Sequence, residues 1–444
     1  MHLFVVGAGH VGLVSATGFR ALGHRVTVAD VQTDRIERLR QGIPPIYEPG
    51  LEEVIRAGLA DGSLAFQSGN VPPADVAVAF VTVSTPPGPD GALSTAHVRS
   101  AVGDLLSTMG TGHTIVVRST LPLGGPAELV ALRGGRADAP AIVTNPEFMR
   151  EGSGLHDFLH PDRVVAGWLE PRDREAAEAV LSLYDGVEAP RLVADAASAA
   201  LIKLASNVFL ATKIAFANEL ARVVEAYGGD VRTVADGIGM DGRIGRGALT
   251  AGPGFGGSCL PEQAVALSEL AAARSVPTPL VDAITASNGT HQQAIVERLA
   301  AHLGGESGTR QLRGCRVAVL GLAFKARTDD VRESPALALV ARLRAAGASV
   351  LASDPRAGAR AQAVDPELAL AASVDAAVDG ADAVLIATEW PEYGSLDWVA
   401  LRRRMAGDLV YDTRAIVDPA AVRAAGLRLV RLGEPDAEAA SLDA

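Results

Sequence analysis

The sequence predicts an α/β protein with two doubly wound parallel sheets joined by a long central helix. Three observations support this fold class. Short apolar segments alternate with helical segments at the start of the chain, an unbroken helical pattern follows, and the alternation resumes in the last third. Strands that alternate with helices are typical of parallel sheets covered by helices.

The first region begins with LFVVG at residues 3–7, which is short, apolar and ended by glycine, as expected of a buried parallel strand. A helix is predicted over 11–22. Further strands are predicted over 25–29, 76–83, 114–118 and 141–144.

The second region is a run rich in Ala and Leu from 196 to 227, with no turn signal before Gly228. A helix of ~30 residues would span ~45 Å, too long for a crossover in a small sheet. We expect a spine between domains with a face for dimerisation. Helices over 261–274 and 279–303 follow.

The last region follows a polar linker (GGESGTRQ, 304–311). Its predicted strands cover 316–320, 349–353, 383–387 and 409–411. We therefore expect a dinucleotide-binding domain over 1–195, a central helical region over 196–303, a second α/β domain over 310–435, and a tail over 436–444.

The composition limits the classes of function. The 444 residues are 48% hydrophobic and carry a formal net charge of −12, so nucleic acid is not an expected partner. No secretion signal or stretch of ~18 uncharged apolar residues is evident, which favours a cytoplasmic protein without a membrane span. Cys259 and Cys315 are the two cysteines, and we expect both to be free thiols.

The segment 7–12 has the pattern GxGxxG between a predicted strand and helix. Gly7 permits the tight turn, Gly9 lets the backbone approach a pyrophosphate, and Gly12 allows close packing. Asp30 ends the next strand, where an acid binds the ribose, and this favours NAD over NADP. Arg35 lies nearby and weakens that preference slightly. The motif predicts a Rossmann-like NAD site.

Cys259 follows a glycine-rich stretch (252–257) and precedes a predicted helix. A helix N-terminus favours the thiolate, which can attack an aldehyde. The local sequence fits a small buried residue in a tight turn equally well.

Lys203 and Asn207 are four residues apart on the long predicted helix and hence share a face. A lysine among apolar neighbours either extends its amine to solvent or has a function. The stretch TNPEFMRE (144–151) follows a strand end, where α/β proteins collect binding groups. A solvated loop is the alternative.

The chain resembles the UDP-glucose/GDP-mannose dehydrogenases over nearly its whole length. Each matching piece is a modest signal, but nine occur in the order of the family. They are VVGAGHVGLV, IPPIYEPGLEEV, STPPGPDG, RSTLPLG, NPEFMREG, LIKLASNVFLATKIAFANEL, DGRIG, GFGGSC and GLAFKARTDDVRESP.

The resemblance implies two Rossmann-like domains joined by a long dimerising helix, and a reaction with two NAD reductions and no metal. The C6 hydroxymethyl group of a nucleotide sugar becomes an aldehyde, then a thiohemiacetal and a thioester on the cysteine, and finally an acid. UDP-glucose oxidation to UDP-glucuronate for polysaccharide biosynthesis is the expected case.

Site residues follow from the resemblance. Cys259 would be the nucleophile, Lys203 and Asn207 would stabilise oxyanions, Glu147 would be the base for thioester hydrolysis, and Thr120 would hold a water. The expected cofactor contacts are Gly7, Gly9, Val11, Gly12, Asp30, Arg35, Thr85, Thr120, Glu151 and Arg332. The expected substrate contacts are Glu147, Phe148, Lys203, Asn207, Gly256, Phe324, Lys325, Arg414 and, reaching the neighbouring subunit's substrate, Arg243.

Two residues after the cysteine depart from the pattern of the family. Glu262 replaces a lysine, which should disfavour both the thiolate and the anionic cofactor, and Gln263 replaces an aspartate and cannot accept a proton. Three explanations remain open: an ordinary 6-dehydrogenase with a weaker proton relay, an enzyme for another nucleotide sugar, or a paralogue that binds without full turnover.

The substrate and the extent of oxidation are also open. GSCLP and FKARTDDVRESP favour GDP-mannose, whereas GIGMDGRIG, NPEFMREG and the long helix favour UDP-glucose, which we choose. A two-electron alcohol dehydrogenase that stops at the aldehyde and a non-catalytic nucleotide-sugar sensor are the competing classes.

Overall fold

A computed structural model describes residues 1–86, 88, 93–304 and 312–435 of the chain. The predicted linker beyond Gly304 and the predicted tail over 436–444 lie outside the described residues. The chain forms two compact units, each considered by itself below. The first comprises Met1–Ser206 and Glu269–Val276, and the second Asn207–Ser268 and Pro277–Ala444.

The first unit contains a sheet in which eight described strands lie in the order β3-β2-β1-β4-β5-β6-β7-β8. All neighbours are parallel except β6 and β7. The strands are β1 (His2–Val6), β2 (Arg25–Asp30), β3 (Leu64–Ser68), β4 (Val78–Val81), β5 (Thr114–Val117), β6 (Ala141–Thr144), β7 (Val164–Trp168) and β8 (Arg191–Asp195).

Both faces of this sheet are buried. Along β1, Leu3 and Val5 belong to one apolar cluster, and Phe4 and Val6 belong to another. This explains why the strand reads as a continuous apolar run. The described helices of the unit are α1 (His10–Ala21), α2 (Thr33–Arg40), α3 (Leu51–Asp61), α4 (Ala96–Thr108), α5 (Gly125–Arg133), α6 (Gly154–Leu159) and α7 (Arg174–Ser182), with a short 3-10 turn, η1 (Pro171–Asp173).

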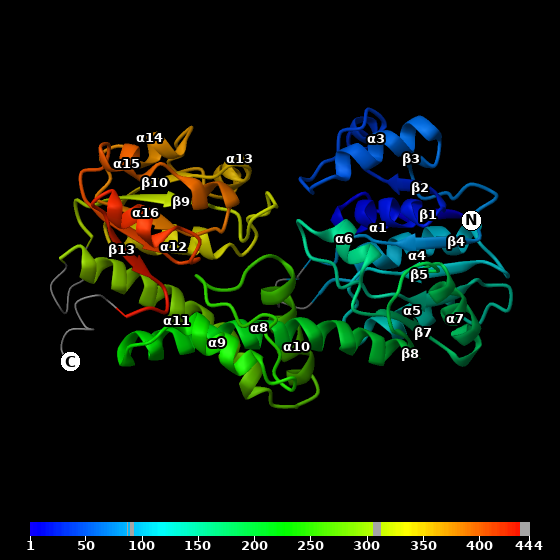
Figure 1. The fold of residues 1–444 in the computed structure, drawn as a ribbon. Helices are drawn as coiled ribbons and strands as arrows, with labels where there is room; N and C mark the ends of the chain where they lie inside the picture. The colour runs from blue at the N-terminus through cyan, green and yellow to red at the C-terminus, as the bar shows by residue number, and fades with distance from the viewer. Residues whose placement is uncertain (87, 89–92, 305–311, 436–444) are drawn as a thin grey trace. The chain divides into compact units, whose positions relative to one another are not determined.

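The predicted long helix is present as α8 (Ala196–Tyr227), with the predicted bounds, and it is visible in Figure 1. Ser206, the last residue of the first unit before the division, lies inside it. By length and composition, α8 is the one helix in the described part of the chain that could cross a membrane, and 44% of its most apolar window is buried. The helix is not an uncharged apolar stretch, because Lys203 and Lys213 lie within it.

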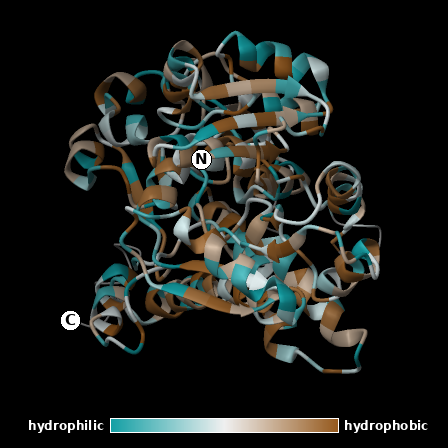
Figure 2. Ribbon diagram, turned by 90° about the vertical axis from the view of Figure 1, so that its right-hand side faces the viewer, coloured by the Kyte–Doolittle hydropathy of each residue, from teal (hydrophilic) through white to brown (hydrophobic). Residues whose placement is uncertain are grey.

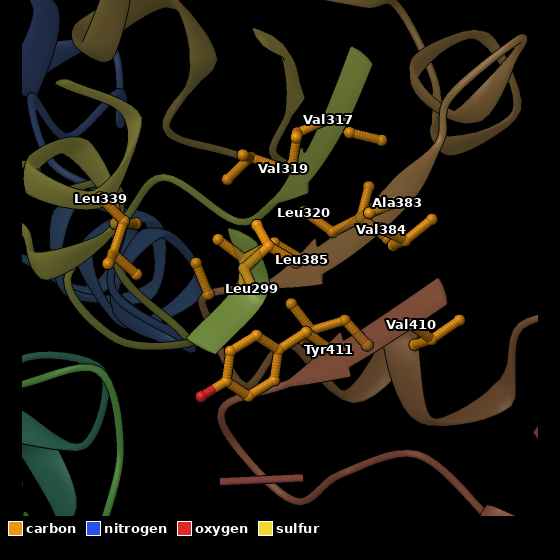
Figure 3. Packing of buried hydrophobic residues seen from close by; sticks show 14 of the residues in the cluster. Leu299, Val317, Val319, Leu320, Leu339, Ala383, Val384, Leu385, Val410 and Tyr411 are labelled. Carbon is orange, nitrogen blue, oxygen red and sulfur yellow. The ribbon is translucent and has the colours of Figure 1, made fainter. Parts of the chain in front are cut away.

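The second unit contains a parallel sheet of five described strands in the order β10-β9-β11-β12-β13. These are β9 (Arg316–Leu320), β10 (Ser349–Ser353), β11 (Ala383–Ile386), β12 (Leu409–Asp412) and β13 (Arg428–Arg431). Figure 2 shows that strand segments are largely hydrophobic. In Figure 3, residues such as Val319, Leu385 and Tyr411 pack with Leu299 and Leu339 from flanking helices.

The described helices of the second unit, besides its part of α8, include the predicted pair α10 (Cys259–Ala272), of which residues 259–268 belong to this unit, and α11 (Pro279–His302). The others are α9 (Val231–Gly239), α12 (Pro335–Ala345), α13 (Gly358–Val364), α14 (Val374–Val378), α15 (Trp398–Arg402) and α16 (Pro419–Ala424), with a short 3-10 turn, η2 (Pro391–Ser395). The observed fold class is the predicted one: two doubly wound α/β sheets and a long helix.

Candidate active site

The glycine-rich loop after β1 has the geometry that its motif predicts. Gly7 has a φ of +107°, and a Cβ there would lie 2.9 Å from the carbonyl oxygen of Thr82. A Cβ on Gly12 would lie 1.8 Å from the carbonyl oxygen of Gly7, so strand and helix can pack only with glycine there. A Cβ on Gly9 would meet no atom within 4 Å, so Gly9 keeps open the approach to the N-terminus of α1. This space fits a dinucleotide pyrophosphate, and Val11 follows in the first turn of α1.

Asp30 is buried at the end of β2 and faces this loop. Its carboxylate accepts hydrogen bonds from the backbone N–H groups of Ala8 and Gln32, both at 2.9 Å. Arg35 donates to the same carboxylate at 3.0 Å. The predicted ribose acid therefore lies beside the glycine loop, and the predicted cofactor contact Arg35 is paired with it.

The other expected residues of this unit lie at the carboxyl ends of neighbouring parallel strands. Thr85 follows β4, Thr120 follows β5, and Glu147 follows β6. The strand order reverses direction between β1 and β4, and such a switch point is where open α/β sheets bind ligands. The Ser119 hydroxyl donates to the Val83 carbonyl at 2.6 Å and ties two of these loops together.

Glu147 and Lys203 form a buried ion pair. The Lys203 amine donates to the Glu147 carboxylate at 2.8 Å and to its backbone carbonyl at 2.6 Å. Burial alone would raise the pKa of Glu147, but the Lys203 ammonium and then the Arg118 guanidinium hold that pKa below its ordinary value. The lysine therefore neither extends to solvent nor stands alone, and Glu147 is held as an anion.

Two further predicted residues border this pair. The Phe148 ring lies 5.5 Å from the Lys203 amine and 3.8 Å from the Arg163 guanidinium carbon. Thr120 and Lys203 line the same small cavity, together with residues from the ends of β5 and β6. The structure thus brings Thr120, Glu147, Phe148 and Lys203 to one place in the first unit.

The sequence reading assigned no role to His10 and Glu48. Buried Glu48 accepts hydrogen bonds from the His10 ring at 2.8 Å and from the backbone N–H groups of Gly152 and Gly154 at 2.7 and 2.8 Å. Burial alone would lower the pKa of His10, but the bond to Glu48 and the charge of Glu151 raise it above its ordinary value. The segment IPPIYEPGLEEV, which resembles the family, contains Glu48 and was the feature of the sequence that could have pointed to this residue.

Arg118 also received no role from the sequence. It is buried, donates to the Asn145 side-chain oxygen at 2.5 Å and to the Tyr184 hydroxyl at 2.7 Å, and lies over the Phe158 ring. Because Asn145 comes two residues before Glu147, this network fixes the start of the Glu147 loop. RSTLPLG, which begins with Arg118, was the corresponding signal.

Cys259 is the first residue of α10 in the second unit, and the structure leaves it exposed. The predicted start at residue 261 was two residues late. Cys259 therefore lies at the helix N-terminus itself, and the Ser258 hydroxyl is 3.8 Å from its sulfur. Cys315 is the other free thiol, so the two cysteines form no disulfide.

The two departures after Cys259 have definite surroundings. Gln263 is buried, and its side-chain oxygen accepts a hydrogen bond from the Asn207 amide at 2.9 Å. Glu262 is half-buried, and burial raises its pKa; Glu333 also raises it, while the Arg332 guanidinium opposes both. Gln263 therefore orients the Asn207 amide. Glu262 places a carboxyl group near Arg332 and Glu333, where the family has the cationic side chain of a lysine.

The glycine stretch before the thiol packs against the segment that follows β9. A Cβ on Gly257 would lie 3.0 Å from the Phe324 ring, and a Cβ on Gly256 would lie 2.3 Å from the Glu333 carbonyl oxygen. The Gly257 N–H donates to the Arg332 carbonyl at 3.0 Å. The Arg332 side chain itself is bonded to Asp330. Gly256, Phe324 and Arg332 thus meet in this unit.

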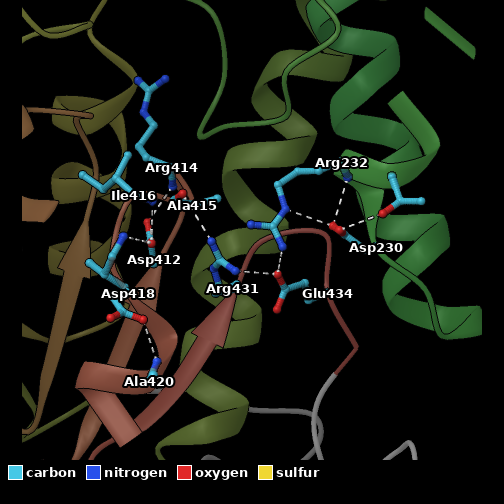
Figure 4. A network of polar contacts seen from close by, with 12 residues as sticks. Asp230, Arg232, Asp412, Arg414, Ala415, Ile416, Asp418, Ala420, Arg431 and Glu434 are labelled. Carbon is cyan, nitrogen blue, oxygen red and sulfur yellow. Dashed lines mark hydrogen bonds and ion pairs between the residues drawn. The ribbon is translucent and has the colours of Figure 1, made fainter. Parts of the chain in front are cut away.

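Arg414 lies beside the same stretch, and a Cβ on Gly252 would lie 3.1 Å from its guanidinium. It donates to the Phe324 carbonyl at 3.1 Å and to the Ala387 carbonyl at 2.9 Å. Asp412 accepts from the backbone of Arg414 at 2.9 Å, and Arg431 donates to the Ala415 carbonyl at 3.2 Å (Figure 4). This network holds the loop that carries Arg414, one of the expected substrate contacts.

Lys325 and Arg243 lie in the second unit as well. The Lys325 amine lies 5.5 Å from the neighbouring Phe324 ring. Arg243 is bonded to Asp241, and its side chain is 90% exposed. The described part of the chain holds no cluster of three or more His, Cys, Asp or Glu residues suited to a metal ion.

Together these features define a dinucleotide-binding dehydrogenase fold with a carboxylate–lysine pair in one unit and an exposed thiol at a helix N-terminus in the other. Three family profiles match the chain. They are the NAD binding domain (residues 1–187), the central domain (197–290) and the UDP binding domain (318–419) of the UDP-glucose/GDP-mannose dehydrogenase family.

Individual relatives agree. The chain is 37% identical to the UDP-glucose 6-dehydrogenase of Rhizobium meliloti, over 98% of this chain and 100% of that one. It is similar to a UDP-glucose dehydrogenase structure from Pyrobaculum islandicum, at 37% identity, a TM-score of 0.84 and 98% coverage of both chains. A UDP-D-ManNAc dehydrogenase structure from Pyrococcus horikoshii has 25% identity and a TM-score of 0.82, over 98% of this chain and 100% of that one.

The chain belongs to the UDP-glucose/GDP-mannose dehydrogenase family. It is accordingly an NAD-dependent oxidoreductase that acts on a nucleotide sugar. The predicted cofactor, NAD, is confirmed by the matching NAD binding domain.

Proposed function

We propose that this protein oxidises the C6 hydroxymethyl group of UDP-glucose to the carboxylate of UDP-glucuronate. The observation that carries the proposal is the pairing of Glu147 with Lys203 in a chain that also places Cys259 at the start of α10. Two relatives that match the chain over nearly its whole length at 37% identity are UDP-glucose dehydrogenases, which supports this substrate. Cofactor binding is assigned to residues 1–195 and nucleotide-sugar binding to 310–435.

Each residue has a role that balances the reaction. Lys203 and Asn207 stabilise the oxyanion as the alcohol is oxidised and as the Cys259 thiolate adds to the aldehyde carbon. NAD, when bound, would accept the hydride lost at each of the two oxidations, and the hydroxyl proton lost with each hydride would pass to water. The second oxidation converts the thiohemiacetal to a thioester. Glu147 then takes a proton from the water that Thr120 holds, and the thiolate leaves as the acid forms.

The substrate test measures NADH formed per sugar consumed. We expect two NADH per UDP-glucose, and little turnover with GDP-mannose or UDP-N-acetylhexosamines. Preference for one of those other sugars would reassign the substrate, and absence of NADH with all of them would refute the dehydrogenase proposal for these sugars.

The nucleophile test replaces Cys259 with Ala. We expect loss of uronate formation, because no thioester can form, while the aldehyde level of oxidation is still reached. Cys315→Ala is the matched control and should keep wild-type turnover. Uronate formation by the Cys259→Ala protein would refute the thioester role.

A second candidate function is favoured by the Gln263–Asn207 bond, because a buried amide stands where the relay of the family has a carboxylate. In this case the enzyme stops at the aldehyde and yields one NADH per sugar. The double change Glu262→Lys with Gln263→Asp tests it. A large gain in acid formation would identify these residues as the limiting defect, and unchanged turnover would assign the site to a different substrate.

We also propose a homodimer formed through α8. Phe209, Phe216 and Val223 follow one another at seven-residue spacing, share one face of the helix, and are 65%, 49% and 52% exposed. A second copy of the chain would cover this face. In the proposed dimer, Arg243 contacts the substrate of the neighbouring subunit. Light scattering should give a dimer for the wild type and a monomer for Phe209→Glu/Phe216→Glu. A wild-type monomer would refute the proposal.

A further inference from the structure

The thiol loop, defined here as residues 252–258, is bonded along its backbone by side chains from two helices. Asn218 on α8 accepts from the Gly252 N–H at 2.9 Å, and the His291 ring on α11 bonds the Gly252 carbonyl at 2.8 Å. Asn288 on α11 accepts from the Phe255 N–H and donates to the Phe255 carbonyl, both at 3.0 Å. Side chains therefore satisfy both polar groups at two positions of the loop.

The loop needs such bonds because glycine gives it little rigidity of its own. Gly254 and Gly257 have φ values of +125° and +77°, which other residues rarely adopt. A Cβ on Gly254 would lie 2.6 Å from the Asn288 side-chain oxygen, so the close approach of Asn288 itself requires glycine. Ordering this backbone loses conformational entropy, which the helix side chains offset.

His291 acts here as a fixed neutral donor. The Arg222 guanidinium lies 2.8 Å from Nδ1 of His291, and a guanidinium can only donate, so Nδ1 carries the lone pair. The proton is then on Nε2, which donates to the Gly252 carbonyl. Burial and the Arg222 charge lower the pKa of His291 to about 4, so the ring stays neutral near pH 7.

We propose that Asn218, Asn288 and His291 are positioning residues that hold the thiol loop so that Cys259 starts α10 in a reactive orientation. The effect of these residues on turnover rests on the function proposed above, whereas their hold on the loop does not. The side-chain bonds to the loop reach as far as Phe255, four residues before Cys259. Closer to the thiol, the Gly257 N–H donates to the Arg332 carbonyl. These three side chains act through the loop backbone and are distinct from the groups assigned to the reacting atoms.

The test compares Asn288→Ala with Ser287→Ala. Both lie on α11, but the Ser287 hydroxyl donates to Glu219 and not to the loop. The rate of Cys259 alkylation by iodoacetamide is measured between pH 6 and 9, and Cys315 in the same molecule serves as the reference. In Asn288→Ala, we expect the Cys259 rate at pH 7 to change by roughly threefold or more relative to Cys315.

The kinetic readout on the same variant is a fall in kcat of roughly 10- to 100-fold with an unchanged KM for NAD. Asn288→Asp keeps the acceptor for the Phe255 N–H and should recover part of both effects, and it serves as the test if Asn288→Ala fails to fold. A wild-type alkylation profile and wild-type kcat in these variants would overturn the proposal, even with a lowered melting temperature.

The alkylation measurement needs no turnover, so it separates the two ideas. If Cys259→Ala still forms uronate, the function assigned to the thiol fails, but a changed Cys259 profile in Asn288→Ala still supports the positioning role. If the profile is unchanged while Cys259→Ala is inactive, the positioning role fails and the proposed function stands.

Discussion

The carboxylate cluster of the first unit (His10, Glu48, Glu147 and Lys203) and the thiol loop of the second (252–258) are held by opposite kinds of interaction. The cluster consists of two acid–base pairs, Glu48 with the His10 ring and Glu147 with the Lys203 amine, and the two carboxylates and the lysine are buried. The loop is held by two amides and a neutral imidazole.

The difference follows from what each region is proposed to do. A base must stay ionised while buried, so Glu147 needs a cation beside it. A nucleophile that directly follows a glycine-rich loop needs a fixed direction, and neutral hydrogen bonds to that loop supply it without adding a charged side chain to the framework. Charged and neutral frameworks also respond differently to pH and to loss of one partner, and the following changes test this contrast.

The largest stability effect is expected for Lys203→Met, which leaves the Glu147 carboxylate buried without its closest cation. Breaking a buried pair costs about 3–5 kcal/mol, and we expect a loss of this size in the free energy of unfolding. Urea denaturation at pH 7 measures it. The double variant Lys203→Met/Glu147→Gln should recover part of the loss. A loss no larger than that of Lys213→Met on the same helix would contradict a charge-built cluster.

The next-largest effect is expected for His291→Gln, which should change how the free energy of unfolding depends on pH. The pKa of His291 falls from 6.5 to about 4 on folding, so the unfolded chain binds more protons between these values. The stabilisation is present above about pH 6.5 and is lost as the pH falls towards 4, a change on the order of 3 kcal/mol. His291→Gln should show a flatter pH dependence of unfolding between pH 7 and 4.5. Identical slopes for both proteins would disprove the assignment.

Glu48→Gln should have a smaller effect on the free energy of unfolding, and this effect should be larger at low pH than at high pH. The pKa of His10 is raised in the folded protein, so the stabilisation from the pair is present below about pH 6.5 and is lost as the pH rises through the folded value. We expect the variant to lose about 1–3 kcal/mol at pH 6 and less at pH 8.5. Glu53→Gln, exposed on α3, is the control, and equal losses at both pH values would count against the pairing.

The smallest effect is expected at Ala248, which precedes the thiol loop and has a φ of +61°. Ala248→Gly should relieve this conformation and raise the free energy of unfolding by about 0.5–1 kcal/mol. Ala283→Gly in the exposed face of α11 should instead lower it by about 1 kcal/mol. A destabilised Ala248→Gly would show that packing outweighs backbone strain there.

Much of the fold could be predicted because the central strands are buried on both faces and read as apolar runs. The described strands that the sequence analysis missed are β3, β8 and β13, which lie at the edges of the two sheets, and β7, an interior strand that pairs antiparallel with β6. β8 has no fully buried residue, so its sequence carries a weak apolar signal. Edge strands are defined by the neighbour they pair with rather than by their own composition.

The sequence by itself determined the features that depend on neighbouring residues: the glycine spacing of residues 7–12, the acid that ends β2, the length of α8, and a cysteine before a helix. Only the tertiary structure decided which distant groups support them. Glu48 bonds an N–H 104 residues away, and Asn288 bonds one 33 residues away. Such partners are set by how sheets and helices pack, and no local pattern records them.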